Sequence, residues 1–154
     1  MRDHPPPAGA GELTYTRVFD APRELVFRCM VEPEHLTHFW GPAGVHTPLD
    51  GIKVDPRPGG VFETAMVNDS DGRQYTMRAI FVEVTEPERL VWTEPASGVT
   101  TTSTFTDLGG ARTEVRIHQA NVPPAFLSPE AQAGFATSLD RFAGYLGQIS
   151  RRQR

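Results

Sequence analysis

The chain has 154 residues, of which 38% are hydrophobic and 22% are charged, and its formal net charge is −4. This length suits one domain with a core large enough to enclose a cavity. The negative charge gives no general attraction for phosphate backbones, so nucleic acid is not an expected partner. The single cysteine, Cys29, excludes an internal disulfide and fits a reducing cytoplasm. We also find neither a signal-peptide pattern nor an apolar run of membrane-spanning length, so we expect a cytoplasmic protein with no membrane partner.

The first third of the chain predicts a tail, a strand and two short helices. Proline and glycine dominate residues 1–12, which predicts a flexible N-terminal tail. Residues 14–19 are rich in β-branched and aromatic side chains, which is typical of a strand. Pro22 follows an aspartate and an alanine, and this order predicts a helix start; Pro33 ends that helix. A second short helix is expected over residues 35–40, before a Gly-Pro pair.

Between Thr47 and Gln119 the sequence alternates between β-rich runs and turn signals, which predicts strands joined by hairpins. The expected strands are residues 49–54, 61–68, 74–85, 90–93, 100–107 and 112–119. Consecutive hairpins of this kind form an antiparallel meander.

The last element has the clearest pattern. Ser128-Pro129-Glu130 combines a capping hydroxyl, a first-turn proline and an early acid, and so predicts a helix start. Apolar residues then recur at steps of three or four as far as Ile149, which predicts an amphipathic helix of about six turns. A long sheet must curl, and this helix is the only element able to cover its concave face. We therefore predict one α+β domain over residues 13–150, with a curved antiparallel sheet of about six to seven strands wrapped around the helix. Residues 151–154 are expected to be a C-terminal tail.

Four segments follow one another in a recognisable order and spacing. They are Phe19-Asp20-Ala21-Pro22-Arg23-Glu24-Leu25-Val26-Phe27, Phe39-Trp40-Gly41-Pro42, Arg57-Pro58-Gly59-Gly60, and Gly134-Phe135 leading to Ser138-Leu139-Asp140-Arg141-Phe142. Together they resemble the helix-grip fold of the SRPBCC (START-like) superfamily, and within it the branch named after the activator of the heat shock protein 90 ATPase. That branch commonly has tryptophan where Phe135 stands, so this chain keeps an aromatic side chain there.

The resemblance implies a helix-grip fold with an internal cavity for a small hydrophobic ligand. Strand parity and the apolar helix faces predict which side chains point into such a cavity. The expected ligand-contacting residues are Phe27, Met30, Trp40, Phe62, Thr64, Met66, Met77, Phe81, Trp92, Ser103, Phe105, Gln119, Phe135 and Leu139. Each of them singly is more often a core residue than a ligand contact. As a set, thioethers and aromatic rings suit an adaptable apolar site.

Few residues in the sequence suggest catalysis or metal binding. Glu83 has the strand parity of Phe81 and is the candidate catalytic residue, because an inward carboxylate has a raised pKa suited to acid–base work. The alternative is that the strand end curls outward and Glu83 pairs with an arginine. His35 and His38 have a spacing that metal sites use, but no third ligand accompanies them, so we expect neither a metal nor another cofactor. Cys29, on an apolar helix face, is expected to be an inert buried thiol.

Three functions stay open, because this fold hosts binding, transport and catalysis. The first is binding or carriage of a small hydrophobic molecule. The second is a cyclase- or hydrolase-type enzyme that acts on a polyketide-like or aromatic ligand. The third is a co-chaperone or protein-interaction module, which only the name of the branch suggests. Apolar residues on both faces of residues 61–68 also leave room for a homodimer.

Overall fold

The computed structural model describes residues 11–152. Most of the predicted N-terminal tail, residues 1–10, lies outside the described residues, as do residues 153 and 154. The first strand, β1 (Gly11–Phe19), begins two residues before the predicted domain boundary. The last helix, α3 (Pro129–Arg152), continues two residues past the predicted one. Gly11, Glu12, Arg151 and Arg152 therefore belong to regular elements and not to tails.

Eight strands form one antiparallel sheet in the order β1-β8-β7-β6-β5-β4-β2, with β3 paired to β4. The other strands are β2 (Val45–His46), β3 (Ile52–Val54), β4 (Val61–Asn68), β5 (Gln74–Thr85), β6 (Arg89–Thr93), β7 (Thr100–Gly109) and β8 (Arg112–Val122). The meander from β4 to β8 is as predicted, and β4 and β5 have the predicted bounds. Pairing of β1 with β8 brings the two ends of the fold together.

Two short segments differ from the prediction. The expected strand over residues 49–54 is split into a 3-10 turn, η1 (Leu49–Gly51), and the three residues of β3. The second short helix, α2 (Pro33–Leu36), begins and ends earlier than expected and gives way to turns. Its proline stands at the start of the helix, where the missing N–H group has no intrahelical partner to lose. Pro33 therefore opens α2 as well as separating it from α1 (Arg23–Cys29).

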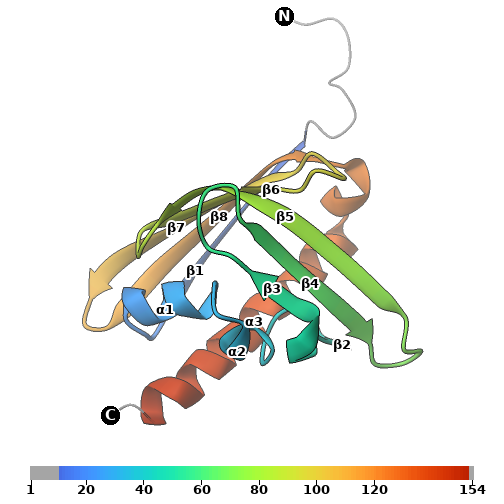
Figure 1. Cartoon of the computed structure of the whole chain (residues 1–154). Coiled ribbons are helices and arrows are strands. Elements are labelled where there is room, and N and C mark those ends of the chain that lie inside the picture. Colours follow the sequence, from blue (N-terminus) through green and yellow to red (C-terminus); the bar gives the residue numbers. More distant parts are fainter. Residues whose placement is uncertain (1–10, 153–154) are drawn as a thin grey trace, which may run out of the picture.

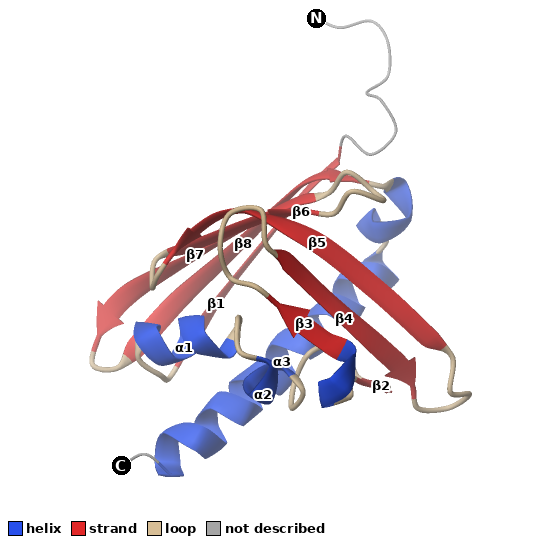
Figure 2. Ribbon diagram, viewed as in Figure 1, coloured by secondary structure: helices blue, strands red, loops and turns tan. Residues whose placement is uncertain are grey.

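The long helix α3 runs beneath the curved sheet (Figures 1 and 2). α2 contacts its C-terminal half through His35 and Tyr145, and α1 packs against β7. A 3-10 turn, η2 (Pro124–Leu127), leads into α3, and the Ser128 hydroxyl caps it by accepting a hydrogen bond from the Ala131 N–H at 3.1 Å. None of the helices in residues 11–152 combines the length and apolar character needed to cross a membrane.

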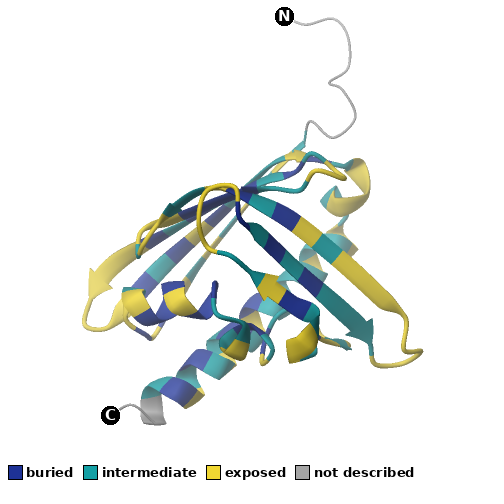
Figure 3. Cartoon of the chain, viewed as in Figure 1, coloured by how far each residue is buried: buried dark blue, intermediate teal, exposed yellow. Residues whose placement is uncertain are grey.

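The core lies between the concave face of the sheet and the apolar face of α3 (Figure 3). Phe142 of α3 packs against Phe19 of β1 and Phe39, with ring centroids 4.9 and 4.2 Å away. Phe27 of α1 packs edge-on against Phe105 of β7 at 5.3 Å. Burial of each such ring stabilises the fold by roughly 1.5–3 kcal/mol, so these contacts hold the helices to the sheet.

Cys29 is fully buried at the end of α1. Burial away from water raises the pKa of its thiol to about 12, because the thiolate loses its hydration. The neutral thiol is a poor nucleophile.

We expect Phe62→Ala to lower the free energy of unfolding by about 3–5 kcal/mol, because Phe62 is fully buried and its removal leaves a void. Val82→Ala, at an exposed position of β5, should change it by less than about 0.5 kcal/mol. Urea denaturation measures both. A small loss for Phe62→Ala would contradict the described packing.

Cys29 should react with a thiol reagent such as Ellman's reagent only when the protein unfolds. The expected result is negligible reaction in native buffer and one equivalent of released chromophore in guanidinium chloride. A fast reaction in native buffer would show that α1 opens readily or that the thiol is not buried.

Candidate functional site

A cavity of about 220 Å³ lies between the sheet and α3. Its wall is largely apolar and comes from both layers of the fold. The lining residues are Phe19, Met30, Phe39, Trp40, Gly41, Pro42, Met66, Met77, Trp92, Glu94, Thr101, Ser103, Val115, Ile117, Gln119, Phe135, Ser138, Leu139 and Phe142. We call this the inner cavity.

A second cavity of about 380 Å³ adjoins the inner one at the end of the sheet near η2. It is lined by Leu13, Tyr15, Val99, Val122, the exposed Phe126, Ala131 and Gly134. Pro42, Glu94, Gln119, Phe135 and Ser138 line both cavities. These shared residues mark the junction, and we call the second space the outer cavity.

Polar side chains of the inner cavity lie side by side across three strands. Thr101 of β7 is paired in register with Trp92 of β6 on one side and with Gln119 of β8 on the other. The Gln119 amide nitrogen donates a hydrogen bond to the Thr101 hydroxyl oxygen at 3.3 Å. Since neighbouring strands present paired residues on the same face, the pairing turns this row toward the inner cavity.

Glu94 is the one carboxylate that lines either cavity in the described part of the chain. It follows β6 two positions after Trp92, so alternation places it on the same face. The turn after β6 holds its backbone: the Glu94 N–H donates to the Val99 carbonyl at 2.8 Å, and the Gly98 N–H donates to the Glu94 carbonyl at 2.7 Å. Burial raises the pKa of the Glu94 carboxyl above its ordinary value.

The two tryptophans that line the inner cavity differ in hydrogen bonding. Trp40 donates its indole N–H to the Thr64 hydroxyl at 3.1 Å. The indole N–H of Trp92 is buried and has no hydrogen-bond partner among the described residues. Trp92 stacks on Phe62, with ring centroids 4.5 Å apart. A buried donor without a partner costs free energy, so an acceptor atom from a ligand would stabilise this position.

The loop that carries Gly41 and Pro42 is fastened to α3. The Arg141 guanidinium donates to the carbonyls of Gly41, Pro42 and Val45 at 2.8, 3.0 and 3.2 Å. Ala43 donates its N–H to the Thr137 hydroxyl at 2.9 Å. Gly41 has a φ of 99°, a conformation that favours glycine. The cavity wall on this side is therefore built on α3 and not on a free loop.

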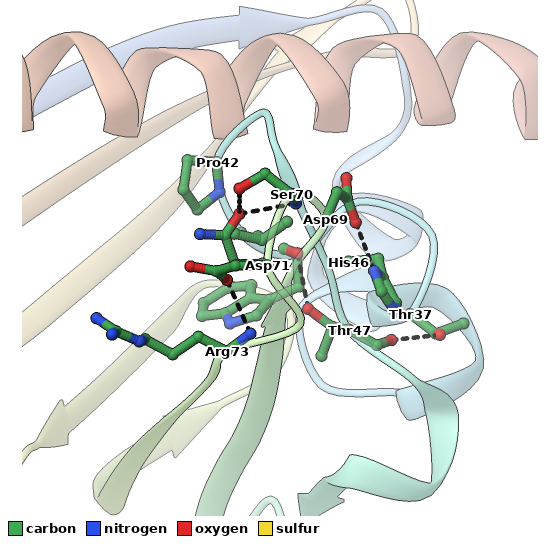
Figure 4. Close-up of polar contacts among 12 residues, drawn as sticks. Thr37, Pro42, His46, Thr47, Asp69, Ser70, Asp71 and Arg73 are labelled. Atoms are coloured by element: carbon green, nitrogen blue, oxygen red, sulfur yellow. Dashed lines mark hydrogen bonds and ion pairs between the residues drawn. The ribbon is translucent and has the colours of Figure 1, made fainter.

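The same loop is tied to the edge of the sheet (Figure 4). His46 contacts the Asp69 carboxylate at 2.6 Å, which links β2 to the turn after β4. The Thr37 hydroxyl donates to the Thr47 carbonyl at 2.7 Å, and the Thr47 hydroxyl donates to the Trp40 carbonyl at 2.9 Å. These bonds fix the backbone that positions the Trp40 ring.

Nine of the predicted ligand-contacting residues line the inner cavity: Met30, Trp40, Met66, Met77, Trp92, Ser103, Gln119, Phe135 and Leu139. The other five, Phe27, Phe62, Thr64, Phe81 and Phe105, lie in the packed core behind the wall. These side chains are buried as predicted, but other core side chains cover them, so they do not reach the cavity.

The expectation that Glu83 faces the interior is wrong. The β5–β6 register shifts between Phe81 and Glu83, and this bulge reverses the alternation after Phe81. Glu83 consequently points outward, where its carboxylate pairs with Arg89 at 3.2 Å and accepts a hydrogen bond from Thr85 at 2.9 Å. The arginine-paired alternative is confirmed.

Sequence reasoning missed Glu94, which lies in a turn where strand parity was not applied. It also missed Thr101, although Thr101 stands two residues before Ser103 on the same strand. The other lining residues not predicted are Phe19, Phe39, Gly41, Pro42, Val115, Ile117, Ser138 and Phe142. Most of these residues can be recognised in the sequence as inward-facing. Only the tertiary packing decides which inward-facing residues line the cavity and which are covered by the core.

The histidines near the cavity serve structural contacts. His35 shares a hydrogen bond with the Tyr145 hydroxyl at 2.5 Å, and His38 stacks on the Tyr145 ring at 5.1 Å. Among residues 11–152, no group of three His, Cys, Asp or Glu side chains gathers in a way that holds a metal ion.

Solved structures of similar fold come from several bacteria. A protein from Chromobacterium violaceum matches with a TM-score of 0.79 and 24% identity over 87% of this chain and 96% of its own. One from Nitrosomonas europaea matches with a TM-score of 0.77 and 25% identity, over 91% and 96%. An AHSA1-like protein from Aeromonas hydrophila matches with a TM-score of 0.79 and 20% identity, over 91% and 94%. A search of curated proteins gave no match.

The model of one protein family matches residues 20–147. Its description is activator of Hsp90 ATPase homolog 1-like protein. This range holds both short helices, β2 to β8 and most of α3, and with them all but three of the residues that line the two cavities. The chain therefore belongs to the activator of Hsp90 ATPase homolog 1-like family and has the helix-grip fold of the SRPBCC superfamily.

Proposed function

We propose that the protein binds a small, largely apolar molecule in the inner cavity. The observation that carries this proposal is the cavity itself: a wall of aromatic, aliphatic and methionine side chains with a few polar groups. Ligand sites of soluble proteins commonly have this composition. Since an apolar cavity of about 150 Å³ accepts benzene, the 220 Å³ found here suits a ligand of one or two rings.

The methionines support a site that adapts to its ligand. Met30 approaches the cavity from the C-terminal cap of α1, Met66 from β4 and Met77 from β5. Unbranched thioether side chains change rotamer at low cost and fill irregular gaps. We infer that the cavity accepts related apolar molecules of slightly different shape.

A second candidate function is proton transfer on a bound ligand, and Glu94 favours it. Its carboxyl is half-buried at the junction of the two cavities, and a raised pKa suits a general acid or base. A test is to incubate the protein with phenylalkyl esters, and with enolisable aromatic ketones in deuterated water, and to follow ester cleavage or deuterium incorporation by mass spectrometry. Turnover that disappears in Glu94→Gln would support catalysis; unchanged compounds would leave binding as the function.

A co-chaperone role has less support. The large exposed hydrophobic residues are Val18, Leu49, Tyr75, Val82, Leu108 and Phe126. They are distributed over β1, η1, β5, β7 and η2, whereas docking sites for proteins are contiguous apolar patches.

Ser103→Phe should fill the inner cavity and abolish binding. Ser103 is buried on β7 and lines the cavity, so an added ring occupies the ligand space. Binding of phenylbutanol can be followed by the fluorescence of Trp40 and Trp92, which both line the cavity. We expect affinity to fall at least about tenfold.

The matched control is Thr104→Phe, the same kind of enlargement one residue along β7 and on its other face. It should bind like the wild type, and thermal melts should show that both variants fold. Equal binding by Ser103→Phe and wild type would remove the inner cavity as the site.

Glu94→Gln should gain stability relative to the wild type as the pH rises. Burial raises the pKa of Glu94 in the folded state, so the folded state holds this proton more tightly than the unfolded state. The corresponding stability is fully present below the ordinary glutamate pKa and is lost as the pH rises through the raised value. Glutamine does not titrate, so the difference in melting temperature should be larger at neutral than at acidic pH. Glu83→Gln controls for the loss of one negative charge outside the cavity, and the same pH trend in both variants would contradict the prediction.

A further inference from the structure

We propose that the cavity selects its ligand by charge: it takes apolar molecules that carry an amine or another hydrogen-bond-donating group, which the Glu94 carboxylate receives, and it rejects carboxylates such as fatty acids. This inference rests on the proposed ligand-binding function and adds the chemical class of the ligand.

The first argument is the charge of the wall. Within residues 11–152, Glu94 is the only carboxylate that lines either cavity, and no Lys, Arg or His lines them. A buried anionic ligand therefore meets a carboxylate and no compensating cation. Burial without a partner makes an ionised group unfavourable, and a like charge nearby adds repulsion that the low-dielectric surroundings strengthen.

The second argument is that Glu94 is free to act. Its carboxylate forms neither a hydrogen bond nor an ion pair with any described residue. The acidic side chains that form ion pairs among the described residues lie outside both cavities, as Glu83 does with Arg89. A ligand amine would give Glu94 the charged hydrogen-bond partner that the protein does not supply.

Gln119, which shares the junction, adds a second acceptor beside Glu94. Its amide nitrogen donates one hydrogen bond to the Thr101 hydroxyl. Its amide oxygen and its second N–H are then left for a ligand. A ligand group with more than one N–H or O–H can donate both to Glu94 and to the Gln119 amide oxygen.

The positive end of α3 does not reverse this preference. The helix begins at Pro129, and its effect on charges falls off within the first turn. Ala131, in that turn, already donates its N–H to the Ser128 hydroxyl. The residues of α3 that line the inner cavity are Phe135, Ser138, Leu139 and Phe142, all beyond that turn, so Glu94 sets the charge preference.

The test compares three probes that share a phenylbutyl body: phenylbutylamine, phenylbutanol and phenylpentanoate. Titrations at mildly alkaline pH follow the fluorescence of Trp40 and Trp92, with calorimetry as a second readout. We expect the amine to bind at least about tenfold more tightly than the carboxylate, with the alcohol between them.

Glu94→Gln should lose the preference for the amine over the carboxylate. Glu83→Gln, a matched change of the same residue type outside the cavity, should keep the wild-type order. If the alcohol binds the wild type but the amine and carboxylate bind equally, or if Glu83→Gln changes the order as much as Glu94→Gln, the charge inference fails and the binding function stands. If none of the three probes binds, both fail.

Discussion

The packing of α3 against the concave face of the sheet is the contact on which the rest of this structure depends. The sheet curls because eight paired strands accumulate the right-handed twist of each strand. One helix covers this face along its middle through Phe142, Leu146 and Ile149, which are all buried. The N-terminal half of α3 contributes Phe135, Ser138 and Leu139 to the wall of the inner cavity, and the sheet contributes Thr101 and Ser103. The same packing therefore creates both the core and the inner cavity.

The loop from Gly41 to Val45 shows how polar contacts complete a site that apolar packing begins. Aromatic contacts hold Phe39 against α3, but the backbone after Trp40 must leave the core and form the cavity wall. The carbonyls of Gly41 and Pro42 lie outside the helices and strands, and buried carbonyls need hydrogen-bond donors. Arg141 donates to both of them and to the Val45 carbonyl. One arginine on α3 thus positions the wall that the sheet alone could not build.

Glu94 departs from what stability favours, because a half-buried carboxyl without a partner costs free energy when it is ionised. The unpartnered indole N–H of Trp92 is a similar departure two residues earlier. Proteins commonly keep such locally unfavourable groups at functional sites. Both groups line the inner cavity, and this coincidence supports the proposed binding function.

The sequence by itself determined the elements whose signals are local. Turn residues and alternation placed β4 and β5 at their bounds, and Ser128-Pro129 placed the start of α3. Alternation also identified five residues of the inner cavity, because the two faces of a strand differ at every step. Only the tertiary structure decided the bulge that turns Glu83 outward, the burial of Phe62 and Phe105 behind the wall, and the place of Glu94 at the junction of the cavities. Each of these depends on which distant segment lies beside the residue, and that neighbour exists only after the strands have paired and α3 has packed beneath them.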